Sequence, residues 1–340
     1  MNIRTLTILF LYASIWITNI YTMENTNIIK PSTPPPLSQA EKRTSLEAFL
    51  KIMFNKIRSG EAHPDSTATD EKLTILHLAT LCNKCDVLQE ALELGTNVNS
   101  ANTDGATPLM AAGFHGYANM VELLLNHHAD ISCLEKTNNI NALHSTAQGG
   151  NLAALKLILT NLQDHPRKIN IINHRSNTGE TPLDIAIQQK DDVAVYYLLK
   201  YGANPNACSC YTPALVLVAQ MPINSKKDKR VCINMTKSLL LFGADINGQD
   251  KGGETALFKA ARGGNLVLVQ TLLQHGANVN HVNHEGHLPV IIAIGNMFKY
   301  KQAKQLTQLL IDSTSIEKVQ NLFETYLFLW GKLFDLVYDH

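Results

Sequence analysis

Three histidines of the chain, His281, His284 and His287, recur at intervals of three residues, and Glu285 stands between the last two. Imidazole rings bind zinc, and a zinc protease places two histidines four residues apart on one face of a helix. The interval here is one residue short, and the three residues fall in a connection rather than in a predicted helix. We therefore expect solvent-facing loop residues, with a metal site as the alternative.

The six cysteines of the chain offer a second possible chemistry. Cys82 and Cys85 have the spacing of redox and metal sites, but no second such pair completes a set of four ligands. A bond between Cys208 and Cys210 would close a small strained ring. We expect buried or unreactive thiols. If the chain reaches an oxidising compartment, some thiols can pair, in a connectivity that the sequence does not give.

Other chemical motifs are incomplete or missing. Residues 245–250 begin like a calcium-binding loop, but the twelfth place of that loop is Ala256, where calcium requires a glutamate. Neither a P-loop nor a Gly-x-Gly-x-x-Gly turn occurs, so no phosphate-binding turn is indicated. The sequence predicts no catalytic residue, no cofactor, no metal and no small-molecule substrate. An enzyme with an unrecognised catalytic part is an alternative to this interpretation.

Composition narrows the class of protein. The chain has 340 residues, 29 basic and 29 acidic, and 45% of its residues are hydrophobic. A net charge of zero gives no global attraction to nucleic acid, so we expect no nucleic-acid partner. The hydrophobic content is too high for a disordered chain, and its longest apolar run is confined to the N-terminus. These numbers indicate a folded protein that is not a polytopic membrane protein.

The elements that position these residues come from a repeat in the middle of the chain. Its first block is represented by Thr107-Pro-Leu, Thr181-Pro-Leu and Thr255-Ala-Leu, and its seven copies start near residues 74, 107, 141, 181, 212, 255 and 288. A second block, such as Gly276-Ala-Asn-Val-Asn, follows most starts by about 21 residues. The third copy loses this second block, which residues 164–170 replace within a longer connection.

Two blocks repeated in phase resemble the ankyrin repeat family over residues 70–312. The resemblance implies an all-α ankyrin-repeat α-solenoid, in which each repeat has two antiparallel helices and a hairpin-like finger. It also implies that His77 and His144, at the histidine position of the first block, form structural hydrogen bonds.

The residues independently fit two helices per repeat. A threonine followed by proline suits the start of a helix, because its hydroxyl caps free N–H groups. The residue between the two helices needs a left-handed backbone or a tight turn. We place there Gly116, Gly150, Gly264, Asn83 and Lys190, the lysine at some conformational cost. The second helices carry apolar residues at helical spacing, among them Val121, Leu124 and Leu125.

The ends of the chain are expected to differ from the repeats. Residues 1–22 form a signal peptide or a signal anchor, because one positive charge precedes about a dozen apolar residues. A start at Met23 is the alternative. Residues 23–37 are a proline-rich linker, residues 38–69 an N-terminal capping helix, and residues 313–340 C-terminal capping helices. A membrane-contacting amphipathic segment is the alternative for this last part.

Two insertions lengthen the period of the repeat, and we expect both to form surface connections. The first adds about seven residues near 164–168, and the second adds about ten residues at 221–230. The second insertion contains Lys226, Lys227, Lys229 and Arg230. It could bind an acidic partner or form a solvated loop.

A partner protein is expected to meet the finger tips and the exposed concave side of the first helices, as the resemblance implies. The residues at these positions are Thr103, Asp104, Phe114, His115, Gln148, Glu180, Gln188, Gln189, Tyr211, Glu254, Arg262, His284 and His287. Aromatic and arginine side chains are frequent interface anchors, which singles out Phe114, Tyr211 and Arg262.

The sequence therefore predicts a non-enzymatic protein-binding scaffold that is secreted or exported by its N-terminal signal. A host-directed, effector-like role is one form of this hypothesis, by analogy with exported ankyrin proteins. The alternative is a membrane-tethered adaptor, in which residues 5–21 are retained as an anchor.

Overall fold

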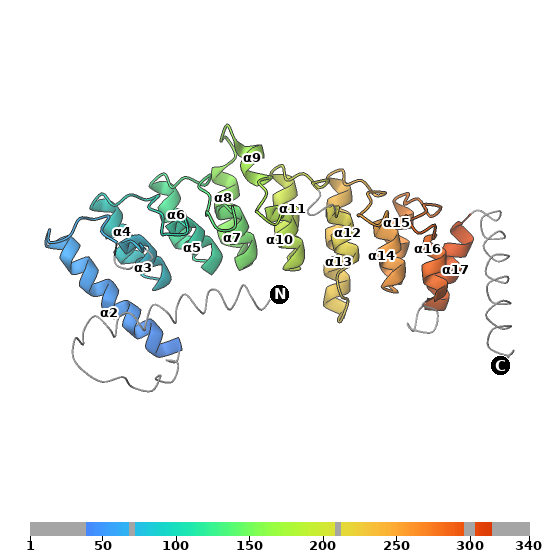
Figure 1. Ribbon diagram of the computed structural model, residues 1–340, viewed down its shortest axis with the longest axis horizontal. Helices are drawn as coiled ribbons and strands as arrows, with labels where there is room; N and C mark the ends of the chain where they lie inside the picture. Colours follow the sequence, from blue (N-terminus) through green and yellow to red (C-terminus); the bar gives the residue numbers. More distant parts are fainter. Residues whose placement is uncertain (1–38, 68–71, 208–211, 296–302, 315–340) are drawn as a thin grey trace. The chain divides into compact units, whose positions relative to one another are not determined.

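The computed structural model describes residues 39–67, 72–207, 212–295 and 303–314 (Figure 1). The described residues form helices joined by turns and loops, without a β-strand. Contacts divide the chain into two compact units, residues 1–108 and 109–340. The expected signal segment at 1–22, the linker at 23–37, Tyr211 and residues 315–340 lie outside the described residues.

The first unit contains a long helix followed by one repeat. Helix α2 spans Gln39–Arg58, and α3 (Ile75–Leu81) and α4 (Cys85–Glu93) form the helix pair. Four side chains of α2 are buried, Leu50, Met53, Phe54 and Ile57. Ion pairs join Glu47 to Lys84 (3.6 Å) and Arg58 to Glu90 (3.4 Å). Helix α2 thus covers the apolar face of the first helix pair, and its predicted role as a cap stays a prediction.

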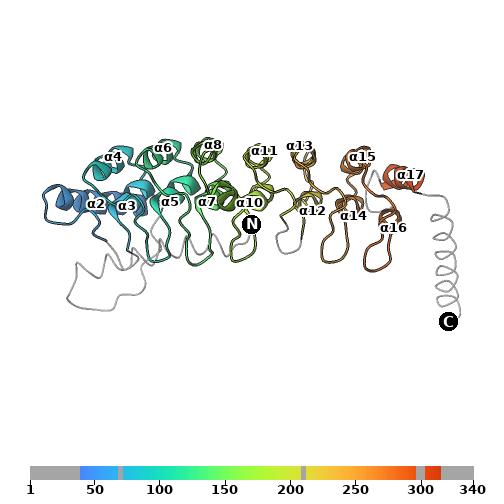
Figure 2. The same cartoon turned by 90° about the horizontal axis from the view of Figure 1, so that it is seen from above.

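The second unit stacks the remaining helix pairs in chain order. Its helices are α5 (Pro108–His115), α6 (Ala118–Asn126), α7 (Ala142–Gly149), α8 (Leu152–Asn161), α9 (Lys168–Ile172), α10 (Pro182–Gln188), α11 (Asp192–Lys200), α12 (Ala214–Ala219), α13 (Lys226–Leu241), α14 (Ala256–Arg262), α15 (Leu266–Gln274), α16 (Pro289–Gly295) and α17 (Ala303–Ser313). Figure 2 shows first helices in one row and second helices in another, with the fingers on the side of the first helices.

Capping side chains explain where many of these helices begin. Thr181 Oγ1 accepts a hydrogen bond from Asp184 N at the start of α10, and Asn141 Oδ1 caps α7 in the same way. The second helices α8 and α11 are capped by Asn151 and Asp191. The expectation fails at Thr255, whose hydroxyl is buried without a partner among the described residues.

The turn between the two helices of a repeat is left-handed, as predicted. Gly116, Gly150 and Gly264 have φ values of 73°, 67° and 67°. Asn83 and Lys190 take the same conformation with φ values of 56° and 58°. Since a side chain at positive φ is strained, Lys190 requires compensation, and the structure supplies it. Its Nζ donates to Pro222 O (3.1 Å) and to Asp228 Oδ1 (3.2 Å) in the next repeat.

The core lies between the two rows of helices. The apolar residues predicted for the second helices are buried there, including Val121, Leu124, Leu155, Ile158 and Val195. Each such side chain contributes about 1.5–3 kcal/mol when it is fully buried. Each helix pair buries part of this surface against the next pair, so stacking supplies the stability of the unit.

Small residues allow α5 and α7 to approach closely. A Cβ atom added at Gly149 would overlap the backbone carbonyl of Phe114, and one added at Gly113 would overlap the Thr146 hydroxyl. Because the first contact is with backbone, no side-chain rotation can relieve it. This close approach fixes the place of Phe114 beside the next repeat.

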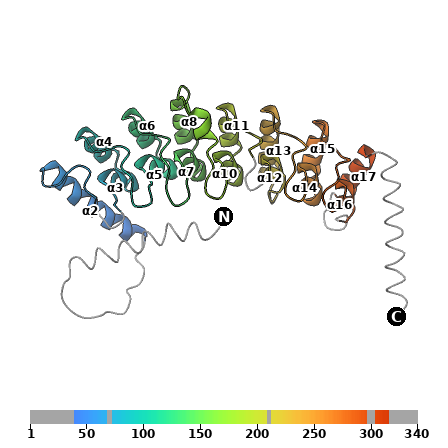
Figure 3. The same cartoon turned by 45° about the horizontal axis from the view of Figure 1, so that its top comes forward.

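The second insertion departs from the expected surface connection. Its basic part is the beginning of α13, which has 16 residues where α6, α11 and α15 have nine each. Ser225 Oγ accepts a hydrogen bond from Asp228 N (3.0 Å) and caps the helix. In Figures 1 and 3, α13 lies between α11 and α15, and in Figure 1 it reaches past its neighbours. The prediction of a solvated loop was therefore wrong for residues 226–230.

Candidate protein-binding surface

The fingers at residues 102–106, 135–140, 176–180, 250–254 and 283–287 are each closed by a short turn of shared design. A backbone N–H donates to the carbonyl four or five residues later, as from Asp250 to Glu254 (3.0 Å) and from Asn283 to His287 (3.0 Å). The first residue also turns its side chain inward, since Asp250 Oδ1 accepts from Gly252 N and Glu254 N, both at 2.9 Å. The fingers are therefore preorganised loops, which reduces the entropy lost when a partner binds.

Side chains at the ends of the first helices form a row beside the fingers. Phe114, Gln148, Gln188 and Arg262 each lie seven residues after the start of their repeat. Gln188 and Arg262 are exposed, and Phe114 and Gln148 are half-buried. Because the first helices stand side by side in Figure 2, the repeat places these four residues along one face of the second unit. We call these four residues the helix-end row.

In the fourth repeat the structure brings two predicted residues together. Gln188 Nε2 donates to Glu180 Oε1 at 2.6 Å, and Thr178 Oγ1 donates to Glu180 Oε2 at 2.7 Å. Glu180 is the last finger residue before the repeat start at Thr181. The finger and the end of α10 are therefore tied together by one carboxylate, which holds the Gln188 amide at the surface.

The sixth repeat has the same connection with ionic partners. Glu254 accepts hydrogen bonds from Lys259 Nζ (2.6 Å) and from Arg262 Nη1 (2.7 Å), and it also meets Arg262 Nη2. Lys259 Nζ reaches Asp250 Oδ2 at 2.6 Å as well. Glu254 is only 6% exposed. The Glu254 carboxylate is therefore buried and positions Arg262, so Glu254 is not part of the exposed surface on which the sequence placed it.

Charge pairing also sets the ionisation of this group. Burial alone would raise the pKa of Glu254, but hydrogen bonds from Arg262 and Lys259 outweigh that effect and hold the pKa below its usual value. The pKa of Lys259 is raised in return, since the hydrogen bonds that its ammonium donates to Asp250 and Glu254 outweigh its desolvation. The four side chains are therefore charged together over the neutral pH range.

Aromatic rings mark the end of α5. The Phe114 ring lies edge-on to His115, with centroids 5.3 Å apart, and His115 stacks on Tyr117 at 5.5 Å. Desolvation of the His115 imidazole lowers its pKa below the usual value. An uncharged ring beside two apolar rings gives this part of the helix-end row a more apolar character than the part at Arg262.

The remaining predicted residues are distributed over both units. Thr103 is exposed and Asp104 half-buried on the finger of the first unit. Gln189 and His284 are exposed, and His287 is half-buried with its Nδ1 3.3 Å from Glu285 Oε2. The structure leaves their predicted contact with a partner untested, as it does for the rest of the predicted set.

Two buried histidines have the structural role that the resemblance implied. His77 Nε2 lies 3.0 Å from Ala106 O, and His144 Nε2 lies 3.2 Å from Glu180 O, so each ring joins its own first helix to the following finger. Burial lowers the pKa of both rings to about 4, although their backbone hydrogen bonds act in the opposite direction. Both rings are therefore neutral near pH 7.

Asp184 occupies the same position in the fourth repeat and behaves differently. Its Oδ2 accepts from Thr181 N (2.9 Å) and from Thr181 Oγ1 (2.8 Å), while Oδ1 has no partner among the described residues. Burial raises its pKa to about 6, and the two bonds from Thr181 act against that rise. The ionised Asp184 carboxylate therefore does not make the connection to the following finger that His77 and His144 make.

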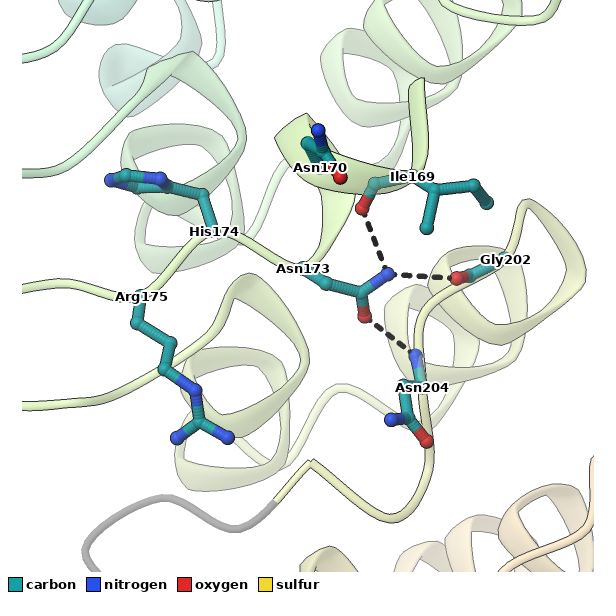
Figure 4. A pocket seen from close by; sticks show the side chains of 7 residues that line it. All are labelled: Ile169, Asn170, Asn173, His174, Arg175, Gly202 and Asn204. Carbon is teal, nitrogen blue, oxygen red and sulfur yellow. Dashed lines mark hydrogen bonds between the residues drawn. The ribbon is translucent and has the colours of Figure 1, made fainter. Parts of the chain in front are cut away.

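The short helix α9 creates an open cleft that sequence reasoning did not anticipate. The cleft has a volume of about 570 Å³ and is lined by Ile169, Asn170, Asn173, His174, Arg175, Gly202 and Asn204 (Figure 4). At its centre Asn173 Nδ2 donates to Ile169 O (2.9 Å) and Gly202 O (3.1 Å), and its Oδ1 accepts from Asn204 N (2.7 Å).

Asn173 corrects the interpretation of the third repeat. Asn247 makes the equivalent bond in a regular repeat, since its Oδ1 accepts from Asn278 N at 2.8 Å. Asn173 stands eight residues before Thr181, as Asn247 stands eight before Thr255. The second block is therefore not lost in the third copy, because α9 displaces its beginning and leaves its final asparagine in place. This spacing of eight residues from the next repeat start is the signal in the sequence that identifies Asn173 as the last residue of the second block.

Few other chemically reactive groups occur among the described residues. Within the ranges described above, no group of three or more His, Cys, Asp and Glu side chains is placed to hold a metal ion. Cys82, Cys85, Cys133 and Cys232 form no disulfide bond with one another, and Cys82 and Cys232 are buried. No helix among the described residues has the length and apolar character that a membrane span requires.

One exposed residue of the fifth repeat was missed. Gln220 follows the start at Thr212 by eight residues, just as Gln189 follows Thr181. It is exposed at the end of α12. The fifth repeat is a weak copy of the first block, so its alignment gave no reason to extend the predicted surface to Gln220.

Known proteins show which sequences share this pattern. A family model described as ankyrin repeats matches three times, over residues 37–135, 127–208 and 229–320. The B-cell lymphoma 3 protein homolog of Mus musculus is 28% identical over 65% of this chain and 48% of its own length. The putative E3 ubiquitin-protein ligase XBAT31 of Arabidopsis thaliana is 28% identical over 41% of this chain and 32% of its own length. The chain spans about half or less of these curated relatives.

Solved structures share the fold. The crystal structure of the ankyrin repeat domain of Bcl-3 matches with a TM-score of 0.57 and 22% identity, over 68% of this chain and 97% of that one. The human ASB11 ankyrin repeat domain matches with a TM-score of 0.52 and 22% identity, over the same shares of the two chains. At this identity the likeness shows the fold alone.

Proposed function

The chain belongs to the ankyrin repeat family, and on that premise we propose that it is a non-enzymatic scaffold that binds a partner protein through the helix-end row and the adjoining finger sides. The row presents an aromatic ring at Phe114, amides at Gln148 and Gln188, and a guanidinium at Arg262. These groups recognise apolar, polar and acidic side chains respectively.

One observation carries this proposal, namely the finger-to-helix bond that recurs in two repeats. Glu180 fixes Gln188 by a bond of 2.6 Å, and Glu254 fixes Arg262 by one of 2.7 Å. Long polar side chains lose rotamer entropy on binding. Because the Gln188 and Arg262 side chains are already held in the folded protein, less rotamer entropy is lost when a partner binds.

Affinity capture tests the proposal when it compares matched variants. The row variant carries Phe114→Ala, Gln188→Ala and Arg262→Gln, and the control carries Asn161→Ala, Gln270→Ala and Gln274→Ala on the second helices. We expect proteins captured by the wild type and the control to be lost with the row variant, while circular dichroism shows that all three proteins are folded. Equal capture by both variants would contradict a binding role for the row.

We also propose that residues 1–22 export the chain, with a retained anchor at residues 5–21 as the second possibility. The order of charge and apolar residues at the N-terminus supports this proposal. N-terminal sequencing of the protein from its native cell distinguishes the two. A new start near residues 19–24 supports cleavage, and an intact N-terminus in the membrane fraction supports the anchor. An intact N-terminus in the soluble fraction of the same cell contradicts both.

A further inference from the structure

The extended helix α13 carries a concentration of positive charge that the protein-binding face does not use. Residues 226–241 include five cations, Lys226, Lys227, Lys229, Arg230 and Lys237, and a single acid, Asp228. All five cations are exposed. The whole chain has no net charge, so this helix is a local departure from the balance of the protein.

The one acid of the helix is engaged elsewhere. Asp228 Oδ2 accepts from Asn224 N at 3.0 Å, and Asp228 Oδ1 accepts from Lys190 Nζ at 3.2 Å. In a helix that turns 100° per residue, Asp228 points about 200° away from Lys226. Asp228 therefore neutralises the charge of Lys190, in the turn of the preceding repeat, and not the exposed cations of α13.

Three of the cations share one face of the helix. Lys226, Arg230 and Lys237 fall within about 40° of each other around the helix axis and span about 16 Å along it. Within the described ranges, none of the three forms an ion pair with an acidic side chain. We call these three residues the basic stripe. Leu241 continues the same face and is 74% exposed.

The opposite face of the helix holds the stripe in place. Val231, Cys232 and Met235 are buried against the neighbouring repeats. Asn234 Nδ2 donates to Asp192 Oδ2 of α11 at 2.6 Å, so this carboxylate of the adjoining helix is also bonded. The cations are thus presented on a rigid helix that is anchored to its neighbours.

We propose that the basic stripe is a second docking site, which binds an acidic segment of a partner protein. A matching segment carries carboxylates about 6 Å and 10 Å apart, the rises between the three cations, followed by an apolar side chain against Leu241. The stripe belongs to a second helix, and the helix-end row belongs to the first helices, so this site is independent of the proposed function.

The chemistry of the stripe favours a protein segment over other anions. Binding of nucleic acid depends on neutralising many phosphates, and three cations on one helix face provide few. Binding to an anionic membrane requires a broad apolar face beneath the cations, whereas Leu241 is a single exposed leucine at the end of the helix. A short acidic segment with one apolar residue matches both the number of charges and this leucine.

Fluorescence anisotropy with the full-length protein tests the site. The probe is a fluorescein-labelled peptide of Glu and Ala residues that ends in Leu. We expect it to bind at low salt, and we expect Lys226→Glu, Arg230→Glu and Lys237→Glu together to weaken binding by about tenfold, since each exposed pair contributes up to a factor of about five. The matched control, Lys51→Glu, Lys56→Glu and Lys136→Glu, changes the net charge equally and is expected to keep the affinity.

The other outcomes overturn the proposal. Equal weakening in the control would show that net charge, and not the stripe, attracts the peptide. Absence of peptide binding to the wild type would remove the site. Tighter binding of phosphatidylserine vesicles or of a single-stranded oligonucleotide, lost with the same three reversals, would assign the stripe to another class of partner. Circular dichroism confirms that both triple variants are folded.

Discussion

Arg262 Nη1 donates a hydrogen bond to Glu254 Oε2 over 2.7 Å, which joins the end of a first helix to the base of the finger that precedes it. Gln188 and Glu180 form the same connection two repeats earlier. In both cases the acid stands immediately before the repeat start and its partner seven residues after that start. The same pair of repeat positions thus both joins the finger to the first helix and orients the surface that we propose for binding.

The burial of Glu254 predicts an unequal effect of two similar substitutions. Glu254→Gln should destabilise the protein by about 1–3 kcal/mol, because Lys259 and Arg262 lose a charged acceptor in a buried place. Glu180→Gln, at a half-exposed site that retains the neutral bond to Gln188, should cost less than about 1 kcal/mol. Urea denaturation of both variants measures the difference. Equal destabilisation would show that the ion network contributes nothing beyond hydrogen bonding.

Acid should weaken this network. The pKa of Glu254 is lowered in the folded protein, so the folded state resists protonation more than the unfolded state does. Its contribution is present above the unfolded pKa and is lost as pH falls through the lowered one. The stability difference between wild type and Glu254→Gln should therefore shrink toward acidic pH. A difference that is constant down to acid unfolding would contradict this assignment.

Asp184 predicts a pH dependence of opposite sign. Its folded pKa is raised to about 6, so the folded protein binds a proton that the unfolded chain has already released. Stability should fall as pH rises from about 4 to about 6, and the loss should then stay constant. Asp184→Asn removes the charge and should stabilise the protein near pH 7 by up to about 3 kcal/mol. Denaturation midpoints across this pH range measure the effect, and an advantage of Asn that does not grow with pH would contradict it.

The buried rings of His77 and His144 should not titrate near neutrality. Desolvation lowers both pKa values to about 4, although hydrogen bonds to Ala106 O and Glu180 O oppose that effect. Unfolding exposes rings that bind protons, so stability should decline as pH falls from about 6.5 toward 4. An NMR titration of the imidazole resonances in the folded protein should show both rings neutral at about pH 5. A midpoint near the usual histidine value would show that the rings are solvated.

We expect Gly149→Ala to destabilise the protein, although Gly149 lies at an exposed helix end. Alanine ordinarily favours a helix over glycine by up to about 1 kcal/mol. At Gly149, however, the new methyl group would overlap the Phe114 carbonyl, so we expect a loss of about 1–3 kcal/mol from the displaced backbone. Gly263 is the same position in the sixth repeat, and there the shortest contact of the methyl group is Lys259 O at 3.3 Å. Gly263→Ala is expected to change stability by less than about 1 kcal/mol, and equal losses at both sites would contradict this packing.

Some of the fold could be predicted because the repeat fixes its phase. Asn83 and Lys190 were assigned to the left-handed turn from alignment alone, and their φ values of 56° and 58° confirm the assignment. The reason for a lysine at the second turn could not be seen in the sequence. Its partners Pro222 and Asp228 lie 32 and 38 residues away, within an insertion that breaks the period.

Insertions account for the rest of what the repeat pattern missed. The capping signal of Ser225 and Asp228 lies in a segment that was interpreted as a loop, because its place in the repeat was unknown. The burial of Glu254 depends on Asp250 and Lys259, whose side chains converge only when the finger folds back on α14. Periodicity therefore predicted where these residues lie in the repeat, but not that Glu254 is buried or which of the residues are already paired.

Hydrogen exchange of the full-length protein with a captured partner bound tests the central claim most directly. We predict slower amide exchange at the ends of α5, α7, α10 and α14 and in the adjoining fingers, with the second helices α8, α11 and α15 unchanged. Protection confined to the second helices, with unchanged exchange around Phe114, Gln188 and Arg262, would contradict the account.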